Sequence, residues 1–333
     1  MPDSLTEAKW YEKRPDNMVV CRLCPFHCRI EDGKRGNCGV RKNEDGILHA
    51  MTYGEVSSIA IDPIEKKPLY HFHPGSPILS VGEWGCNLKC SYCQNSSISQ
   101  NEAQTQKLMP RDLAKICRDH SSVGVAYTYN EPLVAYEYVF DCATAVRAAG
   151  GKNVLVTNGF IDPEPLDKLL PLIDAMNIDI KGFNESFYRR LCKATLEPVL
   201  KTVVAACKKT HVELTTLLIP DTNDAVPELE DLASWIAANC GRQTPVHLTA
   251  YFPSYQMRQT ATTAQHLVHA RGIFKRRLDY VYTGNIHTPG GADTICVNCG
   301  NVVIKRHAFT VASTGMNANG TCANCGAGNN IVV

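Results

Sequence analysis

The middle of the chain alternates between short apolar runs rich in β-branched residues and longer segments whose apolar positions recur with helical spacing. This alternation predicts parallel strands in one sheet with helices packed outside it, the α/β arrangement. Strands are expected at 78–82, 124–129, 153–157, 175–180, 212–219, 246–251 and 280–283, and helices at 110–120, 133–149, 163–172, 187–208, 226–239 and 262–274. About six such strand–helix units predict a partial (β/α)6 barrel that is open on one side.

Three cysteines lie immediately after the first expected strand, in Cys86-Asn-Leu-Lys-Cys90-Ser-Tyr-Cys93. In parallel α/β barrels the chemistry gathers at the carboxyl ends of the strands, which is where this loop falls. Ferredoxin-type runs supply four thiolates to an iron–sulfur cluster, so three thiolates would leave one iron open to another ligand. A zinc loop or three buried cysteines is the alternative, although zinc sites usually pair one CxxC with a second.

Polar residues also follow the next three expected strands. They are Asn130 and Glu131 after the second strand, Thr157 and Asn158 after the third, and Asp179 and Lys181 at the end of the fourth. A carboxylate at Glu131 could accept hydrogen bonds from an ammonium group. Asp179 and Lys181 share one strand face, because they are two residues apart, and could bind a ribose and a carboxylate. Each residue could instead cap a helix or form a turn, but together they predict a ligand site facing the cysteines.

Composition narrows the class of protein. The 333 residues include 16 cysteines, 44% hydrophobic residues and a net charge of +1. No apolar run is long enough to cross a bilayer, and residues 1–10 lack the apolar core of a signal peptide. We therefore expect a cytoplasmic protein whose clustered cysteines bind metal instead of forming disulfides. The balanced charge indicates no nucleic-acid partner, and the lack of a long apolar run indicates no membrane partner. Five isolated cysteines are expected to be packing residues: Cys117, Cys142, Cys192, Cys207 and Cys240.

An N-terminal group of four cysteines comprises Cys21, Cys24, Cys28 and Cys38. Their spacing differs from the paired CxxC arrangement of a zinc ribbon. Either a structural zinc ion or an auxiliary iron–sulfur cluster fits four thiolates, and nothing nearby in the sequence indicates a route for electrons. His27 could substitute as a ligand, but a surface position is expected for it.

A C-terminal group consists of two CxxC pairs, Cys296/Cys299 and Cys322/Cys325, each followed by glycine. The separation of the pairs and the β-like segment between them predict a zinc-ribbon or rubredoxin-like domain that binds one structural zinc, with iron as the alternative. Such a domain could form a docking surface, cover the open barrel mouth or only stabilise the fold. The expected domains are an N-terminal cysteine-rich segment at 1–75, the barrel at 76–289 and the C-terminal domain at 290–333.

The cysteine triplet, with Tyr92 before its last member, resembles the signature of the radical S-adenosylmethionine (SAM) superfamily. The resemblance implies a 4Fe-4S cluster on Cys86, Cys90 and Cys93, whose open iron chelates the amine and carboxylate of SAM and whose electron cleaves it to a 5′-deoxyadenosyl radical. Asn130-Glu131-Pro132 stands where the superfamily has a Gly-Gly-Glu element that helps to hold the SAM amine, with Tyr129 and Asn130 replacing the glycines. Thr157-Asn158-Gly159 and Asp179-Ile180-Lys181 resemble SAM-contacting strand ends of pyruvate formate-lyase activating enzymes.

Further segments are similar to the AmmeMemoRadiSam-system radical SAM proteins. They are Cys21-Arg-Leu-Cys24-Pro-Phe-His-Cys28, Asp62-Pro-Ile-Glu-Lys-Lys67-Pro-Leu-Tyr70-His-Phe-His-Pro74-Gly75, Tyr127-Thr-Tyr-Asn130-Glu131-Pro132, Leu218-Ile-Pro220-Asp-Thr-Asn223-Asp224 and Tyr282-Thr-Gly284-Asn285. This resemblance spans nearly the whole chain. It implies a genetic or physical association with Memo-like proteins, and the family name describes gene neighbourhood, not a reaction.

The function expected from these features is that of a radical SAM enzyme that abstracts hydrogen from a peptide or a small molecule. Its electron donor would be a protein such as flavodoxin or ferredoxin. One alternative, from the likeness to pyruvate formate-lyase activators, is installation of a glycyl radical on a partner enzyme. An alternative of another class is a zinc-ribbon module that binds nucleic acid, for which Lys305-Arg306-His307 and Lys275-Arg276-Arg277 are the candidate basic patches.

Overall fold

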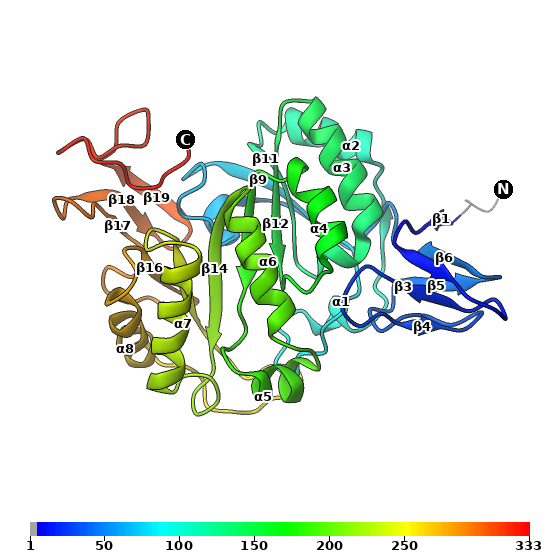
Figure 1. Cartoon of the computed structure of the whole chain (residues 1–333). Coiled ribbons are helices and arrows are strands. Elements are labelled where there is room, and N and C mark those ends of the chain that lie inside the picture. Colours follow the sequence, from blue (N-terminus) through cyan, green and yellow to red (C-terminus); the bar gives the residue numbers. More distant parts are fainter. Residues whose placement is uncertain (1–4) are drawn as a thin grey trace.

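The computed structural model describes residues 5–333 and centres on one eight-stranded sheet (Figure 1). The strand order is β16-β15-β14-β13-β12-β11-β9-β8, and β8 runs antiparallel to β9 while the other seven are parallel. The strands are β8 (Ser58–Pro63), β9 (Pro77–Gly82), β11 (Gly124–Tyr127), β12 (Lys152–Thr157), β13 (Ala175–Asp179), β14 (His211–Leu218), β15 (Val246–Ala250) and β16 (Val281–Gly284). The α/β class and the seven parallel strands are confirmed. The antiparallel edge strand β8 was not expected.

Helices lie between the strands in the chain and pack along the sheet (Figure 1). The main ones are α2 (Pro110–Asp119), α3 (Tyr136–Ala148), α4 (Pro163–Leu169), α6 (Glu197–Cys207), α7 (Val226–Asn239) and α8 (Ala264–Lys275). Short turns are α1 (Ser96–Ser99) and the 3-10 turns η1 (Ile64–Lys66), η2 (Pro132–Ala135) and η3 (Leu170–Leu172). Every residue of β11 and β15 is buried, as expected for strands covered on both faces.

The helix expected at 187–208 is wrong, because the structure breaks it into three pieces. They are α5 (Glu185–Phe187), a π-helical turn η4 (Tyr188–Cys192) and α6. Lys193 ends the π turn in the left-handed conformation, with φ 57°. Pro198 lies in the first turn of α6, where its missing N–H costs no helical hydrogen bond. The break leaves backbone groups of η4 free to bind another loop, as described below.

The N-terminal segment forms small sheets beside the main one. They are β1 (Thr6–Glu7), β6 (Ile47–Ala50) and β5 (Arg41–Glu44), then β2 (Tyr11–Lys13), β3 (Val19–Cys21) and β4 (Arg29–Ile30), and the pair β7 (Glu55–Val56) with β10 (Gln106–Lys107). Arg41 in β5 pairs with Glu137 in α3 at 2.7 Å, and both side chains are 1% exposed. Because a lone charge is costly to bury, this pair holds the N-terminal segment firmly against α3.

The C-terminal segment forms a three-stranded sheet of β17 (Thr294–Ile295), β18 (Val302–His307) and β19 (Thr310–Thr314). Arg306 donates to the backbone oxygen of Tyr70 at 2.6 Å and pairs with Glu65 at 3.4 Å, and neither charged side chain is exposed. In Figure 1 this small sheet lies at the upper left, beside β16, whereas the strands of the main sheet point their carboxyl ends down toward α5. The C-terminal segment therefore does not cover the carboxyl-end mouth.

Burial of Arg306 also corrects the basic patch considered for Lys305-Arg306-His307. Its guanidinium is occupied inside the protein and cannot contact a nucleic-acid phosphate. None of the described helices is long and apolar enough to cross a membrane.

Candidate metal and SAM site

The loop after β9 carries Cys86, Cys90 and Cys93 and is fixed by backbone hydrogen bonds to the π turn. Lys89 N–H donates to the carbonyl of Cys192 at 2.9 Å, and Ser91 N–H donates to that of Leu191 at 3.0 Å. The broken helix thus binds the cysteine loop, and π turns are often found at functional sites.

Gly85 is required where the loop begins. Its φ is 89°, and a Cβ there would lie 2.5 Å from Val40 Cγ1 and 2.8 Å from the carbonyl oxygen of Cys38. The cysteine loop therefore packs directly against the N-terminal segment.

The three loop thiols have polar neighbours. Cys93 Sγ lies 3.1 Å from Ser99 Oγ, and Asn158 Nδ2 lies 3.7 Å from Cys86 Sγ. The neighbouring thiol of Cys192 raises the pKa of Cys90, and burial adds to this. Cys192, expected to be a packing residue, is thus a buried neighbour of the loop, and nothing in its sequence surroundings marks it.

Tyr92 is buried, and its hydroxyl lies 3.4 Å from Cys192 Sγ. Its ring packs against Phe187 of α5, with ring centroids 5.9 Å apart. Tyr92 therefore anchors the loop to the π turn in the structure.

Glu131 joins the ends of two neighbouring strands. Its carboxylate accepts hydrogen bonds from Thr157 Oγ1 at 2.6 Å, from Asn158 N–H at 2.8 Å and from Leu133 N–H at 3.0 Å. The side chain is 2% exposed, and burial raises its pKa to about 7 although these hydrogen bonds lower it. Three residues predicted to share a site thus lie together, and Glu131 also caps η2.

Asp179 and Lys181 form an ion pair, with Lys181 Nζ 2.6 Å from Asp179 Oδ2. Both side chains are partly exposed at the end of β13. Burial would lower the pKa of Lys181, but Asp179 and the nearby thiol of Cys90 keep that pKa above its usual value. The shared strand face expected from their spacing brings the two side chains into contact with each other.

Asn130 reaches back to the start of the cysteine loop. Its Nδ2 donates to the carbonyl of Gly85 at 3.0 Å, while its buried Oδ1 has no partner among the described residues. The preceding Tyr129 has φ 73° and donates its hydroxyl to Asp62 at 2.8 Å. Asn130 thus lies beside the loop as predicted.

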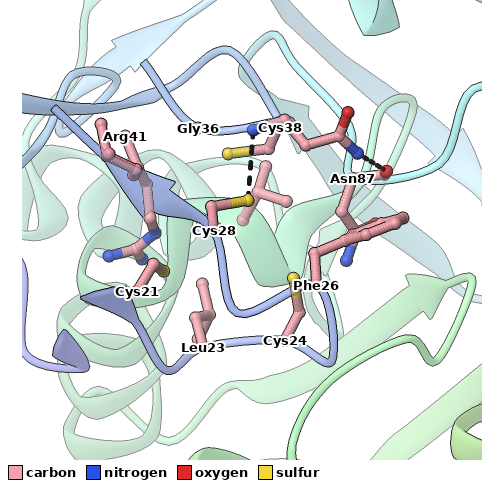
Figure 2. A pocket seen from close by; sticks show the side chains of 12 residues that line it. Cys21, Leu23, Cys24, Phe26, Cys28, Gly36, Cys38, Arg41 and Asn87 are labelled. Atoms are coloured by element: carbon pink, nitrogen blue, oxygen red, sulfur yellow. Dashed lines mark hydrogen bonds between the residues drawn. The ribbon is translucent and has the colours of Figure 1, made fainter. Parts of the chain in front are cut away.

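The four N-terminal cysteines line one pocket (Figure 2). Asn87, in the loop after β9, lines the same pocket. Its backbone carbonyl accepts a hydrogen bond from Asn37 Nδ2 at 2.7 Å. His27 points elsewhere and pairs with Asp162 at 2.6 Å, which agrees with a surface position. Arg41 also lines the pocket. No local sequence motif predicts that Arg41 or Asn87 belongs to this site.

The four C-terminal cysteines come close together. The Sγ atoms of Cys296 and Cys325 lie 3.6 Å apart, those of Cys299 and Cys322 lie 3.7 Å apart, and all four lie within 4.8 Å of one another. Metal–thiolate bonds of 2.3 Å in a tetrahedron place sulfurs about 3.8 Å apart. The structure therefore contains a four-cysteine site that fits one tetrahedral ion.

Comparison with known proteins identifies the class. Residues 85–234 match the family model of the radical SAM superfamily. The chain is 43% identical to an uncharacterised protein of Methanocaldococcus jannaschii over 311 residues, covering 92% of each chain. Residues 85–234 therefore form a radical SAM domain, and this superfamily of enzymes implies an iron–sulfur cluster and SAM.

More distant relatives include enzymes of named activity. The chain is 26% identical to a pyruvate formate-lyase-activating enzyme of Listeria monocytogenes over 164 residues, which are 46% of this chain and 66% of that relative. A solved radical SAM methyltransferase from Sphaerobacter thermophilus shares the fold with a TM-score of 0.50 and 14% identity, over 64% of this chain and 67% of that chain. The sequence analysis expected homology to pyruvate formate-lyase activating enzymes, and this sequence identity confirms it.

Glu83, just before the cysteine loop, gives a prediction about pH. It is 2% exposed, its Oε1 has no partner among the described residues, and burial raises its pKa from 4.5 to about 8. The unfolded chain loses this proton above 4.5 while the folded chain keeps it, so stability falls as the pH rises from 4.5 toward 8. In Glu83→Gln, the drop in the free energy of unfolding between about pH 5 and pH 8 should shrink by about 1–3 kcal/mol, measured by urea denaturation. Equal drops in the two proteins would contradict the prediction.

Proposed function

We propose that this protein uses a 4Fe-4S cluster on Cys86, Cys90 and Cys93 to cleave SAM reductively and to abstract hydrogen from a peptide or small-molecule substrate. One observation carries the proposal: the three thiols sit in a single loop at the carboxyl ends of the parallel strands, beside Glu131, Thr157 and Asn158. The distances among these three sulfurs also support the proposal. Within residues 5–333, only the four C-terminal cysteines are close enough together to bind a single ion. The three loop thiols are therefore too far apart to share one ion, as expected for ligands of a cluster.

The proposal also gives roles to the surrounding residues. When bound, the cluster supplies the electron that cleaves SAM, which is the chemistry of the cofactor. Glu131 and Asn130 lie where an ammonium group could be held, while Asp179 and Lys181 present a carboxylate and an ammonium at the next strand end. Tyr92 and Cys90 of the loop are buried, while Cys86 and Cys93 are partly exposed.

Two observations bear on the nature of the substrate. Several relatives are activating enzymes of glycyl-radical enzymes, which favours the alternative that this chain installs a glycyl radical on a partner. However, the superfamily match covers residues 85–234 and includes neither the N-terminal nor the C-terminal cysteines. We therefore favour a different peptide or small-molecule target. Association with Memo-like proteins and reduction by flavodoxin or ferredoxin are part of this proposal.

The proposed function includes a domain arrangement. The seven parallel strands and their helices would form the partial (β/α)6 barrel, with 1–75 and 290–333 as additions before and after it. The two CxxC knuckles support a zinc-ribbon-like unit, since Gly300 N–H and Gly326 N–H bond back to the carbonyls of Cys296 and Cys322. Zinc is the proposed ion there, because four thiolates leave no open position for chemistry.

The first test removes a cluster ligand. Cys93→Ala should lower formation of 5′-deoxyadenosine from SAM by more than about a hundredfold, because even residues behind metal ligands cost 10–100-fold. The assay uses anaerobically reconstituted protein with dithionite. Cys240→Ala, a thiol outside all three cysteine groups, should keep the activity. A Cys93→Ala protein that still forms the product at the normal rate would sink the assignment.

The second test concerns SAM binding. Glu131→Gln and Asp179→Asn should each weaken SAM binding about tenfold, since a charge-assisted hydrogen bond contributes about 1.5–3 kcal/mol. Iron content should stay near that of the unchanged protein. Asp167→Asn removes an exposed carboxylate that pairs with Lys209, and it should leave SAM affinity unchanged. Calorimetry showing normal affinity in both site variants would refute the strand-end assignment.

The third test concerns the C-terminal ion. Cys322→Ser should lower the zinc content by about one ion per chain and lower the melting temperature, because a structural zinc site contributes directly to folding. Iron bound by the loop after β9 should remain. Elemental analysis of the full chain checks both metals, with Cys240→Ser as the control. Unchanged zinc content would show that another site or another metal is involved.

A further inference from the structure

The four N-terminal thiols come from separate parts of the segment and face one space. Cys21 ends β3, Cys24 and Cys28 lie in the connection to β4, and Cys38 precedes β5. Figure 2 shows their side chains around a common pocket, with Arg41 beside Cys21 and Asn87 on the opposite side. None of the four is in a disulfide. The chain thus builds a site of four free thiols far from the C-terminal set.

The spacing of these thiols differs from that of a single-ion site. The C-terminal cysteines serve as an internal reference, with all four sulfurs within 4.8 Å. Within residues 5–333, the C-terminal cysteines are the only group of three or more candidate ligands that all lie within 4.8 Å of one another. No three of the N-terminal sulfurs therefore meet this distance. A single zinc would need sulfurs about 3.8 Å apart. An iron–sulfur cluster holds four thiolates farther apart, since iron and sulfide ions lie between them.

Backbone N–H groups lie close to these thiols. Asn37 N–H donates to Cys28 Sγ at 3.4 Å. Burial raises the pKa of Cys21, Cys24 and Cys38, and the backbone N–H groups two positions later lower it in part. In the loop after β9, the Leu88 N–H acts on the pKa of Cys86 in the same way. Hydrogen bonds to a thiolate favour its charged form, which is the form that binds metal.

Arg41 gives an independent indication of a buried anion. Its two terminal nitrogens bond to Glu137 at 3.3 and 2.7 Å, but its Nε has no partner in the part of the chain that the structure describes. The side chain is 1% exposed and lines the pocket. Leaving a guanidinium N–H unpaired in the interior is costly. Four thiolates around a cluster carry net negative charge, and they would supply the missing acceptor.

We propose that Cys21, Cys24, Cys28 and Cys38 bind a second iron–sulfur cluster beside the one assigned to Cys86, Cys90 and Cys93. Asn87 links the two cysteine sets. Asn87 lines the N-terminal pocket and directly follows Cys86, and its Oδ1 accepts from Asn158 Nδ2, which also approaches Cys86 Sγ.

The second cluster acts as an electron relay. All four thiolates are used, so no iron is left open to bind a substrate. One electron passes from a reduced flavodoxin- or ferredoxin-type donor, which is oxidised, to this cluster. The cluster is reoxidised as it passes that electron to the one on the loop after β9. Cys24 and Cys28 are partly exposed, so a donor protein can approach this side of the pair. This role rests on the proposed function, whereas the presence of the cluster does not.

Metal analysis tests the cluster itself. In the full chain with Cys86→Ala, Cys90→Ala and Cys93→Ala combined, iron and acid-labile sulfide should remain in roughly equal amounts, with the Mössbauer signature of an iron–sulfur cluster. Adding Cys24→Ser should remove both while the C-terminal ion stays. The unchanged protein, which needs no variant to fold, should contain more iron and sulfide than one cluster holds. A triplet variant without iron but with an extra zinc, or an unchanged protein with iron for one cluster only, overturns the proposal.

A comparison of reductants tests the relay. Cys24→Ser alone should lower SAM cleavage by about tenfold or more with reduced flavodoxin, yet change it little with dithionite, a small reductant that can reach the partly exposed Cys86 and Cys93 directly. Cys240→Ser should behave as the unchanged protein with both reductants. Equal rates with flavodoxin in Cys24→Ser and the unchanged protein overturn the relay. Loss of cleavage with both reductants in the unchanged protein would instead contradict the proposed function.

Discussion

The arrangement of the site depends on one buried carboxylate. Glu131 lies at the end of β11, and it accepts hydrogen bonds from Thr157 and Asn158 at the end of β12 and from Leu133 in η2. An unpaired carboxylate would be costly at 2% exposure, so these three donors must stay in place for the fold to be stable. Asn158 in turn contacts Cys86 and Asn87. One side chain therefore fixes two strand ends against the cysteine loop.

Repeating patterns made much of the fold predictable from the sequence. Seven parallel strands were expected close to where they occur, because buried strands read as apolar runs and their connections contain amphipathic helices. The helix at 187–208 was wrong because tertiary contacts to the cysteine loop stabilise a π turn that local propensity does not encode. The strand β8 was missed because its burial pattern is mostly intermediate or exposed and its pairing with β9 is a long-range property.

The site was predictable where the sequence spacing of cysteines indicates metal binding, as in Cys86, Cys90 and Cys93 and in the two CxxC pairs. It was not predictable where residues distant in the chain meet. Cys192 reaches Cys90 only through the broken helix, and Arg41 reaches the N-terminal cysteines by way of its pair with Glu137. The metal at the N-terminal cysteines was open in the sequence because zinc and a cluster use the same ligands. Our proposal chooses between the two from the sulfur spacing, which only the folded structure provides.

The contacts between the beginning of the sheet and residue 332 have a consequence for synthesis. Val332 N–H donates to the carbonyl of His71 at 2.8 Å, and His73 N–H donates to the carbonyl of Val332 at 2.7 Å. During translation, domains tend to fold from the N-terminus onward. Both cysteine sets near the N-terminus are complete once residue 93 has been made, whereas the contacts of His71 and His73 wait until residue 332 has been made. The cysteines that would bind metal are thus made long before the segment that closes this edge of the sheet.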